Sequence, residues 1–239
     1  MTRNNDIKAL VFDVFGTVVD WRTSISTQAA VFGAKHNVTT DWDKFADDWR
    51  AGYGAGMAKV NAGEDAWKLV DTIHRERLEV ILHEHGFPYI DEEELADFNK
   101  AWHRLAGWPD ATNGLSRLKS KFVIASLSNG NVALLTNMAK YASLPWDAVL
   151  SAELANKYKP HPSVYQRAAE LLGLKPAQVM MVAAHNFDLR GAINAGLKAA
   201  LVIRPDEFGD SKDPDLEAEP DFDYFAKDFH DLADQLGCK

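Results

Sequence analysis

The sequence predicts a doubly wound α/β fold, in which a parallel sheet carries helices on both faces, with a second, helical domain inserted into it. Two observations support this prediction. Short apolar runs bounded by turn residues alternate with helical patterns after residue 109. These runs are apolar at successive positions, which is typical of strands buried on both faces. The segment 21–108 contains no such run, so it is expected to be all helical.

The expected strands of the sheet follow one another along the chain with helices between them. The first is "IKALVFD", Ile7 to Asp13. Later apolar runs predict further strands at 122–128, 148–151, 179–184 and 198–203.

Helices are expected between these later runs. After Pro162, which suits a helix start, Val164, Ala168 and Leu171 share one helical face, and this helix is expected to end near Gly173. A second helix should cover 186–196, with a glycine at its C-terminal end. Strand and helix in repetition indicate the α/β class.

The remaining segments interrupt this alternation. Helical patterns near 23–34, 41–60, 65–85 and 91–105 predict a separate helical domain over 21–108, so that residues 1–20 and 109–239 form the α/β core. The stretch 204–223 carries nine acidic residues and three prolines, and it is predicted to be a solvated loop before a last short helix.

Composition excludes several classes of function. The chain has 239 residues and a net charge of -9, which disfavours nucleic acid and anionic membranes as partners. The single cysteine, Cys238, permits neither an internal disulfide nor a cysteine metal site. The polar segment 1–8 lacks the apolar stretch of a signal peptide, and no membrane span is expected. We therefore expect a cytoplasmic protein.

Polar residues follow several of the predicted strands. Because ligands of open α/β sheets bind outside the carboxyl ends of the strands, these residues are candidates for one site. A buried carboxylate near a lysine and hydroxyl groups would stay ionised, as a nucleophile requires, so Asp13 is the candidate nucleophile. The candidates at this edge are Asp13, Thr17, Ser128, Asn129, Lys159 and Asp188.

Four motifs in order carry a family resemblance. They are hhhhDxxGT at 13–17, hhhhSN at 128–129, Lys159-Pro160, and Asp188 after a fourth strand. Together they resemble the haloacid dehalogenase superfamily over the whole chain, with 21–108 as its cap domain. Most members of that superfamily are phosphatases, so the fold alone does not determine the reaction.

Two departures from the phosphatase pattern distinguish this chain. Phosphatases of the superfamily carry a general acid two residues after the nucleophile, where this chain has Phe15. In "VAAHNFD" only Asp188 is acidic, which leaves few carboxylates for Mg²⁺, and no metal or other cofactor is expected. The same departures, with "WR" at Trp49 and Arg50, resemble the L-2-haloacid dehalogenase branch.

That resemblance implies a mechanism. The Asp13 carboxylate would displace the halogen of a short (S)-2-haloalkanoic acid, and water would hydrolyse the resulting ester to a 2-hydroxy acid. Halide needs no proton from an acid, only a cation or N–H donors. The branch commonly forms homodimers, so a homodimer is expected.

The resemblance also implies roles for individual residues. Lys159 would pair with Asp13, and Asp188 with Lys159, Thr17 or the hydrolytic water, whose activating group is left open. The residues implied in substrate binding are Arg50 and Asn129 for the halide, the N–H groups of Val14 and Phe15 with Ser128 for the substrate carboxylate, and His185 and Tyr165 as pocket-lining residues.

Other interpretations of these residues stay open. An aspartate at a strand end is often only a turn former or helix cap, and a lone arginine on a helix is usually solvated. A phosphomonoester phosphatase with eroded motifs would require Mg²⁺. A non-catalytic protein of the same fold would bind anions without turnover.

Overall fold

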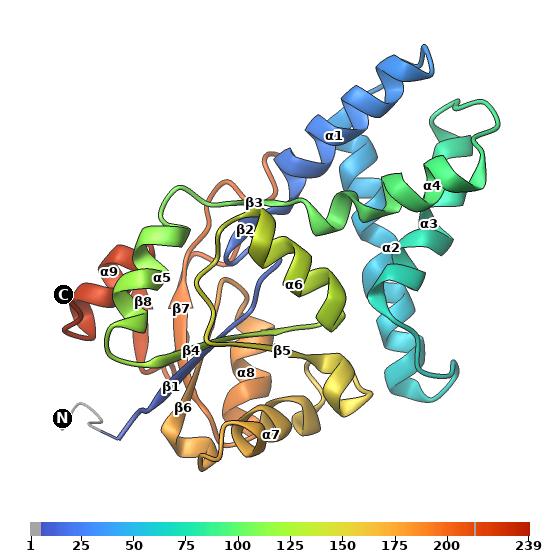
Figure 1. Ribbon diagram of the computed structural model, residues 1–239. Coiled ribbons are helices and arrows are strands. Elements are labelled where there is room, and N and C mark those ends of the chain that lie inside the picture. The colour runs from blue at the N-terminus through green and yellow to red at the C-terminus, as the bar shows by residue number, and fades with distance from the viewer. Residues whose placement is uncertain (1–5, 213) are drawn as a thin grey trace.

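A six-stranded parallel sheet forms the centre of the computed structural model, which describes residues 6–212 and 214–239 (Figure 1). The strand order is β5-β4-β1-β6-β7-β8, with every neighbouring pair parallel. The strands are β1 (Ala9–Phe12), β4 (Val123–Ser128), β5 (Ala148–Ser151), β6 (Val179–Ala183), β7 (Lys198–Val202) and β8 (Tyr224–Ala226).

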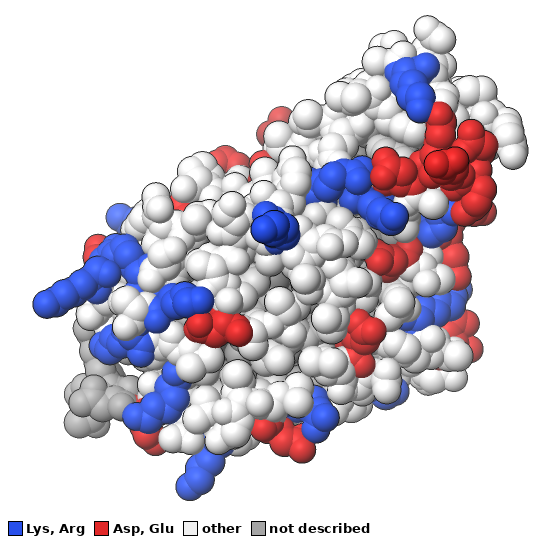
Figure 2. All heavy atoms as spheres, viewed as in Figure 1, with Lys and Arg blue, Asp and Glu red and all other residues white. Residues whose placement is uncertain are grey.

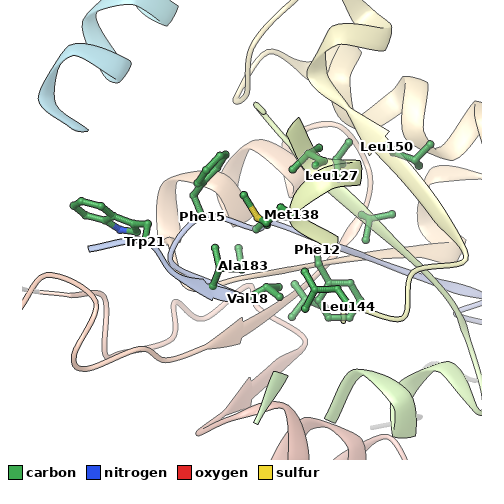
Figure 3. Close-up of a cluster of buried hydrophobic side chains, with 14 of the residues drawn as sticks. Phe12, Phe15, Val18, Trp21, Leu127, Met138, Leu144, Leu150 and Ala183 are labelled. Atoms are coloured by element: carbon green, nitrogen blue, oxygen red, sulfur yellow. The ribbon is translucent and has the colours of Figure 1, made fainter. Parts of the chain in front are cut away.

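The sheet is the core of the larger part of the molecule. All residues of β1 and β6, the two central strands, are buried. Figure 3 shows buried hydrophobic side chains of this region, among them Phe12, Leu127, Met138 and Leu144. Continuous apolarity in the sequence therefore corresponds to strands covered on both faces, as expected for a parallel sheet.

Helices cover the two faces of the sheet (Figure 1). Helix α5 packs against α9, and α7 packs against α8, on opposite sides. The helices and short 3-10 turns of this part are α5 (Ala111–Lys119), α6 (Val132–Tyr141), η2 (Ala152–Ala155), α7 (Pro162–Leu171), η3 (Pro176–Gln178), α8 (Asn186–Asn194) and α9 (Phe229–Gln235).

The insert is a group of helices standing beside the sheet (Figure 1). It comprises α1 (Trp21–Lys35), α2 (Trp42–Ala62), α3 (Val70–Glu84), α4 (Glu92–Asn99) and the short η1 (Lys100–His103). Two short strands, β2 (Val19–Asp20) and β3 (Ala106–Gly107), pair antiparallel where the chain enters and leaves it. Both connections to the core therefore lie side by side.

The predicted fold class is confirmed, and the five expected strands are present. The structure adds β8, a three-residue strand within the C-terminal region, and the β2–β3 pair, of which β3 lies inside the range expected to be all helical. Leu171, expected on the buried face of α7, is 45% exposed. Residues 1–5 of the predicted core, and residue 213 of the acidic stretch, lie outside the described residues.

Charged side chains of both signs are interspersed on the face drawn in Figure 2. Acidic residues gather at the outer end of the helical insert, where α4 begins with Glu92, Glu93 and Glu94. In the part of the chain that the structure describes, no helix is long and apolar enough to cross a membrane.

Candidate active site

Asp13 lies immediately after β1, at the carboxyl edge of the sheet, and is almost completely buried. The chain then turns sharply at Gly16, whose φ of +85° is the left-handed conformation that glycine adopts without strain. This turn brings Thr17 back toward the carboxylate, and Thr17 Oγ1 donates to Asp13 Oδ2 at 2.9 Å. The Thr17 hydroxyl in turn accepts from the backbone N–H of Ala184 at 2.9 Å, after β6.

Lys159 joins Asp13 to Asp188. Its Nζ donates to Asp13 Oδ1 at 2.8 Å and also to Asp188 Oδ2, and all three side chains are buried. Asn129 fixes the segment that carries Lys159, because its Oδ1 accepts from the Lys159 backbone N–H at 2.8 Å. Tyr165 supports Asp188 from the other side by donating its hydroxyl to Oδ1 at 2.6 Å.

These contacts determine which groups carry charge. Burial alone would raise the pKa of Asp13, but the Lys159 charge and a hydrogen bond from His185 outweigh burial, so that the pKa is lowered. Burial would lower the pKa of Lys159, yet the two carboxylates beside it raise that pKa. The site therefore holds an ionised Asp13 carboxylate against a permanent ammonium group.

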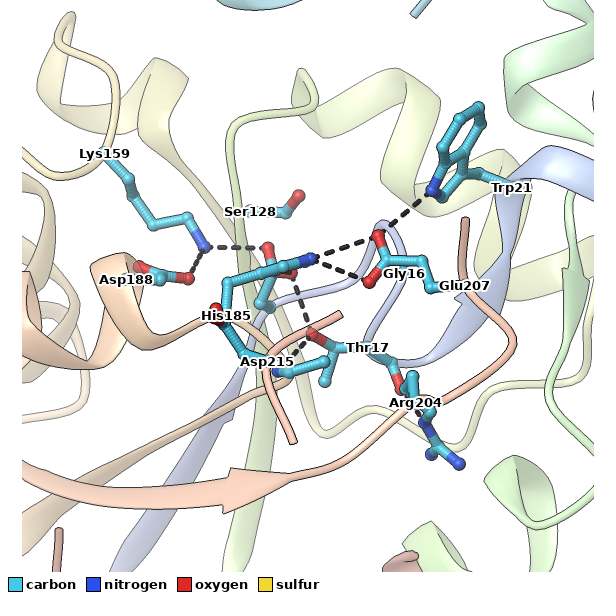
Figure 4. A network of polar contacts seen from close by, with 12 residues as sticks. Gly16, Thr17, Trp21, Ser128, Lys159, His185, Asp188, Arg204, Glu207 and Asp215 are labelled. Atoms are coloured by element: carbon cyan, nitrogen blue, oxygen red, sulfur yellow. Dashed lines mark hydrogen bonds and ion pairs between the residues drawn. The ribbon is translucent and has the colours of Figure 1, made fainter. Parts of the chain in front are cut away.

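His185 occupies a second position beside the nucleophile (Figure 4). Its Nδ1 lies 3.3 Å from Asp13 Oδ2, and its Nε2 lies 2.9 Å from an oxygen of the buried Glu207. Burial would lower the pKa of His185, but the charge of Glu207 and hydrogen bonds to Glu207 and Asp13 raise it to about 10. At neutral pH His185 is therefore a second cation next to Asp13.

Glu207 corrects the interpretation of the acidic stretch 206–223 as a solvated loop. It follows β7, is only 2% exposed, and also accepts from Trp21 Nε1 at 3.1 Å. A Cβ atom at Gly16 would lie 2.0 Å from its Oε1, so glycine at the turn leaves the space that Glu207 fills. Figure 4 shows its carboxylate between Trp21 and His185.

A cavity of about 480 Å³ opens onto Asp13. Its lining comes from the core and from two helices of the insert, α1 and α2. From the core come Asp13, Asn129, Lys159, His185, Phe187, Glu207, Phe208, Ser211 and Lys212, and from the insert come Trp21, Asp47, Arg50, Ala51, Tyr53, Gly54 and Met57. A larger cavity of about 680 Å³, between α1 and α4, includes none of the predicted site residues.

Arg50 brings a cation to this cavity from α2. Its guanidinium carbon lies 4.0 Å from the Tyr53 ring centroid, 5.3 Å from that of Phe15 and 5.4 Å from that of Trp21. Among the described residues, its buried Nη1 has no hydrogen-bond partner. The nearby Asp47 is paired with Arg22 instead, at 2.9 Å. A cation held by aromatic rings, with a donor left over, suits an anionic ligand.

The Phe15 side chain is buried against aromatic rings. It is 1% exposed and contacts the rings of Tyr53, His74 and Trp102 with centroid distances of 6.0, 6.4 and 6.0 Å. The backbone N–H groups of Val14 and Phe15 have no acceptor among the described residues. Position 15 thus supplies a buried ring that packs behind Tyr53 and a backbone N–H near Asp13, but no acid.

Four residues predicted to bind substrate do not line the cavity, namely Val14, Phe15, Ser128 and Tyr165. Ser128 ends β4 and is fully buried; its Oγ accepts a long contact of 3.5 Å from Gly130 N–H. Tyr165 is also fully buried, and the structure places it behind Asp188 rather than on the cavity wall. Its role as a pocket-lining residue is therefore not supported by the geometry.

Comparison with known proteins identifies the family of the chain. A family model of haloacid dehalogenase-like hydrolases matches residues 7–196. The chain belongs to this family. An (S)-2-haloacid dehalogenase of Xanthobacter autotrophicus is 34% identical over 201 residues, 83% of this chain and 76% of that protein. (S)-2-haloacid dehalogenase 4A of Burkholderia cepacia is 30% identical over 84% of both chains.

Solved structures extend the likeness of this haloacid dehalogenase-like hydrolase over nearly its whole length. The crystal structure of a defluorinating L-2-haloacid dehalogenase superposes with a TM-score of 0.94 at 43% identity, covering 97% of this chain and 96% of that one. An L-2-haloacid dehalogenase from Xanthobacter autotrophicus with chloropropionic acid covalently bound gives a TM-score of 0.79 at 27% identity, covering 97% and 98%.

The residues of this hydrolase do not fit the Mg²⁺ ion that phosphatases of the superfamily hold. Both oxygens of Asp13 and of Asp188 already accept hydrogen bonds, including two from Lys159. Mg²⁺ requires carboxylate and water oxygens in near-octahedral arrangement, and here an ammonium group lies between the two carboxylates. We therefore derive no step through a metal.

Glu207, Trp21 and Tyr53 line the cavity but were not among the predicted site residues. Two signals were available. Tyr53 lies three residues after Arg50, and so on the same face of its helix. Glu207 follows the carboxyl end of β7, the same kind of position that identified Asp13 after β1.

Proposed function

We propose that this protein hydrolyses short (S)-2-haloalkanoic acids, such as haloacetates and 2-halopropionates, to 2-hydroxy acids without a metal. One observation carries the proposal: an ionised Asp13 carboxylate faces a cavity that also contains the unpaired Arg50 guanidinium, while phenylalanine stands at position 15. A carboxylate nucleophile beside an anion-binding cation suits displacement of a leaving group that departs as an anion.

In the first step, one oxygen of Asp13 attacks C2 of the substrate from the side opposite the halogen. A carbon–oxygen bond forms while the carbon–halogen bond breaks, and halide leaves with the bonding electron pair. The configuration at C2 is inverted. No proton is consumed, which agrees with the absence of an acidic side chain at position 15.

The second step is hydrolysis of the Asp13 ester. Water attacks the Asp13 carbonyl carbon, the acyl–oxygen bond breaks, and the carboxylate returns together with the 2-hydroxy acid. One proton is released in the complete reaction. Thr17, Lys159 and His185 donate to the Asp13 oxygens in the resting state, so donors are already in place for negative charge that develops there.

Substrate-binding roles follow from the free donors. We propose that Arg50 and Asn129 receive the departing halide, since both line the cavity with Asp13. We propose that the substrate carboxylate binds the backbone N–H groups of Val14 and Phe15, which lack acceptors among the described residues, with Ser128 nearby. The Asp13 carboxylate that displaces halide from C2 is largely desolvated, and fixed hydrogen-bond donors take the place of its water shell, which favours the attack.

We also propose that 21–108 functions as a cap domain over a core formed by 1–20 and 109–239. Two observations support this division: β2 and β3 pair at its boundaries, and α2 contributes Arg50 to a cavity whose floor is Asp13. A homodimer stays a prediction from the resemblance, and a cytoplasmic location stays a prediction from composition; light scattering of the full chain tests the first.

Halide release tests the proposed function. We expect the wild type to release chloride from chloroacetate and (S)-2-chloropropionate in EDTA, and Asp13→Asn to release none. Asp221→Asn, in the exposed acidic stretch, serves as the matched control and should behave as wild type. Hydrolysis of a phosphomonoester that depends on Mg²⁺, without halide release, would favour the phosphatase alternative. Anion binding without either reaction would favour a binding protein.

A further inference from the structure

One face of α2 forms the wall of the cavity contributed by the insert. Arg50, Gly54 and Met57 line the cavity and follow one another at spacings of four and three residues, so they share a helix face. Gly54 lies four residues beyond Arg50, which corresponds to about 6 Å along the helix axis. The wall therefore changes from a cation at Arg50 to a residue without a side chain, and then to the apolar Met57.

Gly54 differs from the two other glycines nearby in the same helix. A Cβ atom at Gly52 would lie 2.6 Å from Arg77 Cγ, and one at Gly56 would lie 2.7 Å from Ile73 Cγ2. Both glycines are explained by close packing of α3 against α2. A Cβ atom at Gly54 would meet no atom within 4 Å. Packing between helices therefore does not require glycine at position 54.

Backbone conformation does not require it either. Among the described residues, every other glycine has either a positive φ or an atom within 4 Å of its built Cβ. Gly54 has neither, although a glycine inside a helix destabilises the helix relative to alanine. The space beside Gly54 is instead part of the cavity, at a point where the residue is exposed.

We propose that Gly54 holds open the part of the cavity that receives the substituent on C2 of the haloacid, so that this protein accepts substituents larger than methyl. This inference rests on the proposed function. With the reacting carbon at Asp13 and the halide bound near Arg50, an ethyl or propyl substituent can extend along α2 past Gly54 and contact Met57. A side chain at position 54 would occupy that space.

The experiment compares substrates of increasing size. We would measure kcat/KM for chloroacetate, (S)-2-chloropropionate and (S)-2-chlorobutanoate with wild type, Gly54→Ala, Gly54→Leu and Ala55→Leu. Ala55 is the matched control, because it is the next residue of α2, is exposed and does not line the cavity. Thermal unfolding of each variant would verify that it is folded.

We expect wild type to turn over all three acids. Gly54→Leu should lower the kcat/KM ratio of chlorobutanoate to chloroacetate by at least tenfold, Gly54→Ala should lower it less, and Ala55→Leu should leave it unchanged. An unchanged ratio in Gly54→Leu, an equal fall in Ala55→Leu, or a wild type inactive on chlorobutanoate but active on chloroacetate would overturn this inference alone. A wild type that releases halide from none of the acids would overturn the proposed function and this inference with it.

Discussion

Asp13 keeps its negative charge in a buried position because three donors converge on its two oxygens. Lys159 donates to Oδ1, while Thr17 and His185 approach Oδ2 at 2.9 and 3.3 Å. A buried carboxylate without partners would take up a proton instead. The same contacts therefore stabilise the folded chain and keep the nucleophile ionised.

The Glu207–His185 pair makes a prediction about pH. Glu207→Gln removes the charge that holds the pKa of His185 at about 10, so this pKa should fall toward its ordinary 6.5. NMR titration of labelled histidine measures the change, with Glu217→Gln in the exposed part of the same loop as control. A His185 pKa that does not move in Glu207→Gln would contradict the assignment.

The same pair makes stability depend on pH. Because the folded pKa of His185 lies above the unfolded one, its contribution to the free energy of unfolding is complete below about 6.5 and is lost as pH rises through about 10. Loss of the charged partner in Glu207→Gln should make this decline smaller over that pH range.

At the residue scale, the side chains that could be predicted either follow an expected strand or belong to one of the family motifs. Asp13, Lys159 and Asp188 were predicted together and lie within direct contact in the structure. Glu207 was not predicted, because nine acidic residues share its stretch and the sequence alone does not indicate which of them turns inward. Its burial depends on His185, Trp21 and the space at Gly16, which come from distant segments.

Among the elements, helix α2 contains glycines with different surroundings, and replacing them with alanine should change the free energy of unfolding in opposite directions. Gly54→Ala should raise the free energy of unfolding by about 0.5 to 1 kcal/mol, since it removes the entropic cost of glycine without a clash. Gly56→Ala should lower it by about 1 to 3 kcal/mol through overpacking against Ile73. Chemical denaturation measures both; equal effects of the two substitutions would contradict this account of α2.

The start of α3 and the additional strand β8 differ from the sequence-based expectation. The pattern over 65–85 predicts one helix, but α3 begins only at Val70. Helix α2 ends at Ala62, before Gly63 with a φ of +78°, and residues 63–69 connect the two helices. β8 has three residues and exists by pairing with β7 at the sheet edge. Such a short strand has no periodic pattern of its own to detect.

In the whole molecule, hydrogen bonds join the helical insert to the core. Asn131, at the start of α6, donates through Nδ2 to Asp71 Oδ2 of α3 at 3.0 Å. At another point Asn61, of α2, donates to the backbone carbonyl of Tyr158 at 2.9 Å. These contacts set how Arg50 faces Asp13.

Breaking one of these contacts should loosen the insert. Asn131→Ala removes a buried hydrogen-bond partner, which costs about 1 to 3 kcal/mol. Hydrogen–deuterium exchange should accelerate in α3, and KM should rise as Arg50 is held less firmly. Thr136→Ala, exposed on the same α6, is the control. Unchanged exchange in α3 of Asn131→Ala would show that this contact does not hold the insert.

The overall architecture could be predicted because it depends on local patterns, namely the apolar runs of the strands and the helical periodicity of 21–108. The orientation of the insert could not. It depends on pairs such as Asn131 with Asp71 and Asn61 with Tyr158, separated by 60 and 97 residues. No local pattern indicates such pairs, so the cavity between insert and core becomes visible only in the structure.

Oxygen transfer from Asp13 is the central claim, and one labelling experiment tests it most directly. With enzyme in excess over (S)-2-chloropropionate in H₂¹⁸O, the product of the single turnover takes its new oxygen from Asp13, and water then replaces that oxygen in the carboxylate. Mass spectrometry should therefore find unlabelled lactate and one ¹⁸O atom in the peptide containing Asp13. Labelled lactate with an unlabelled peptide would mean that water attacks C2 directly, and would contradict the assignment of Asp13 as nucleophile.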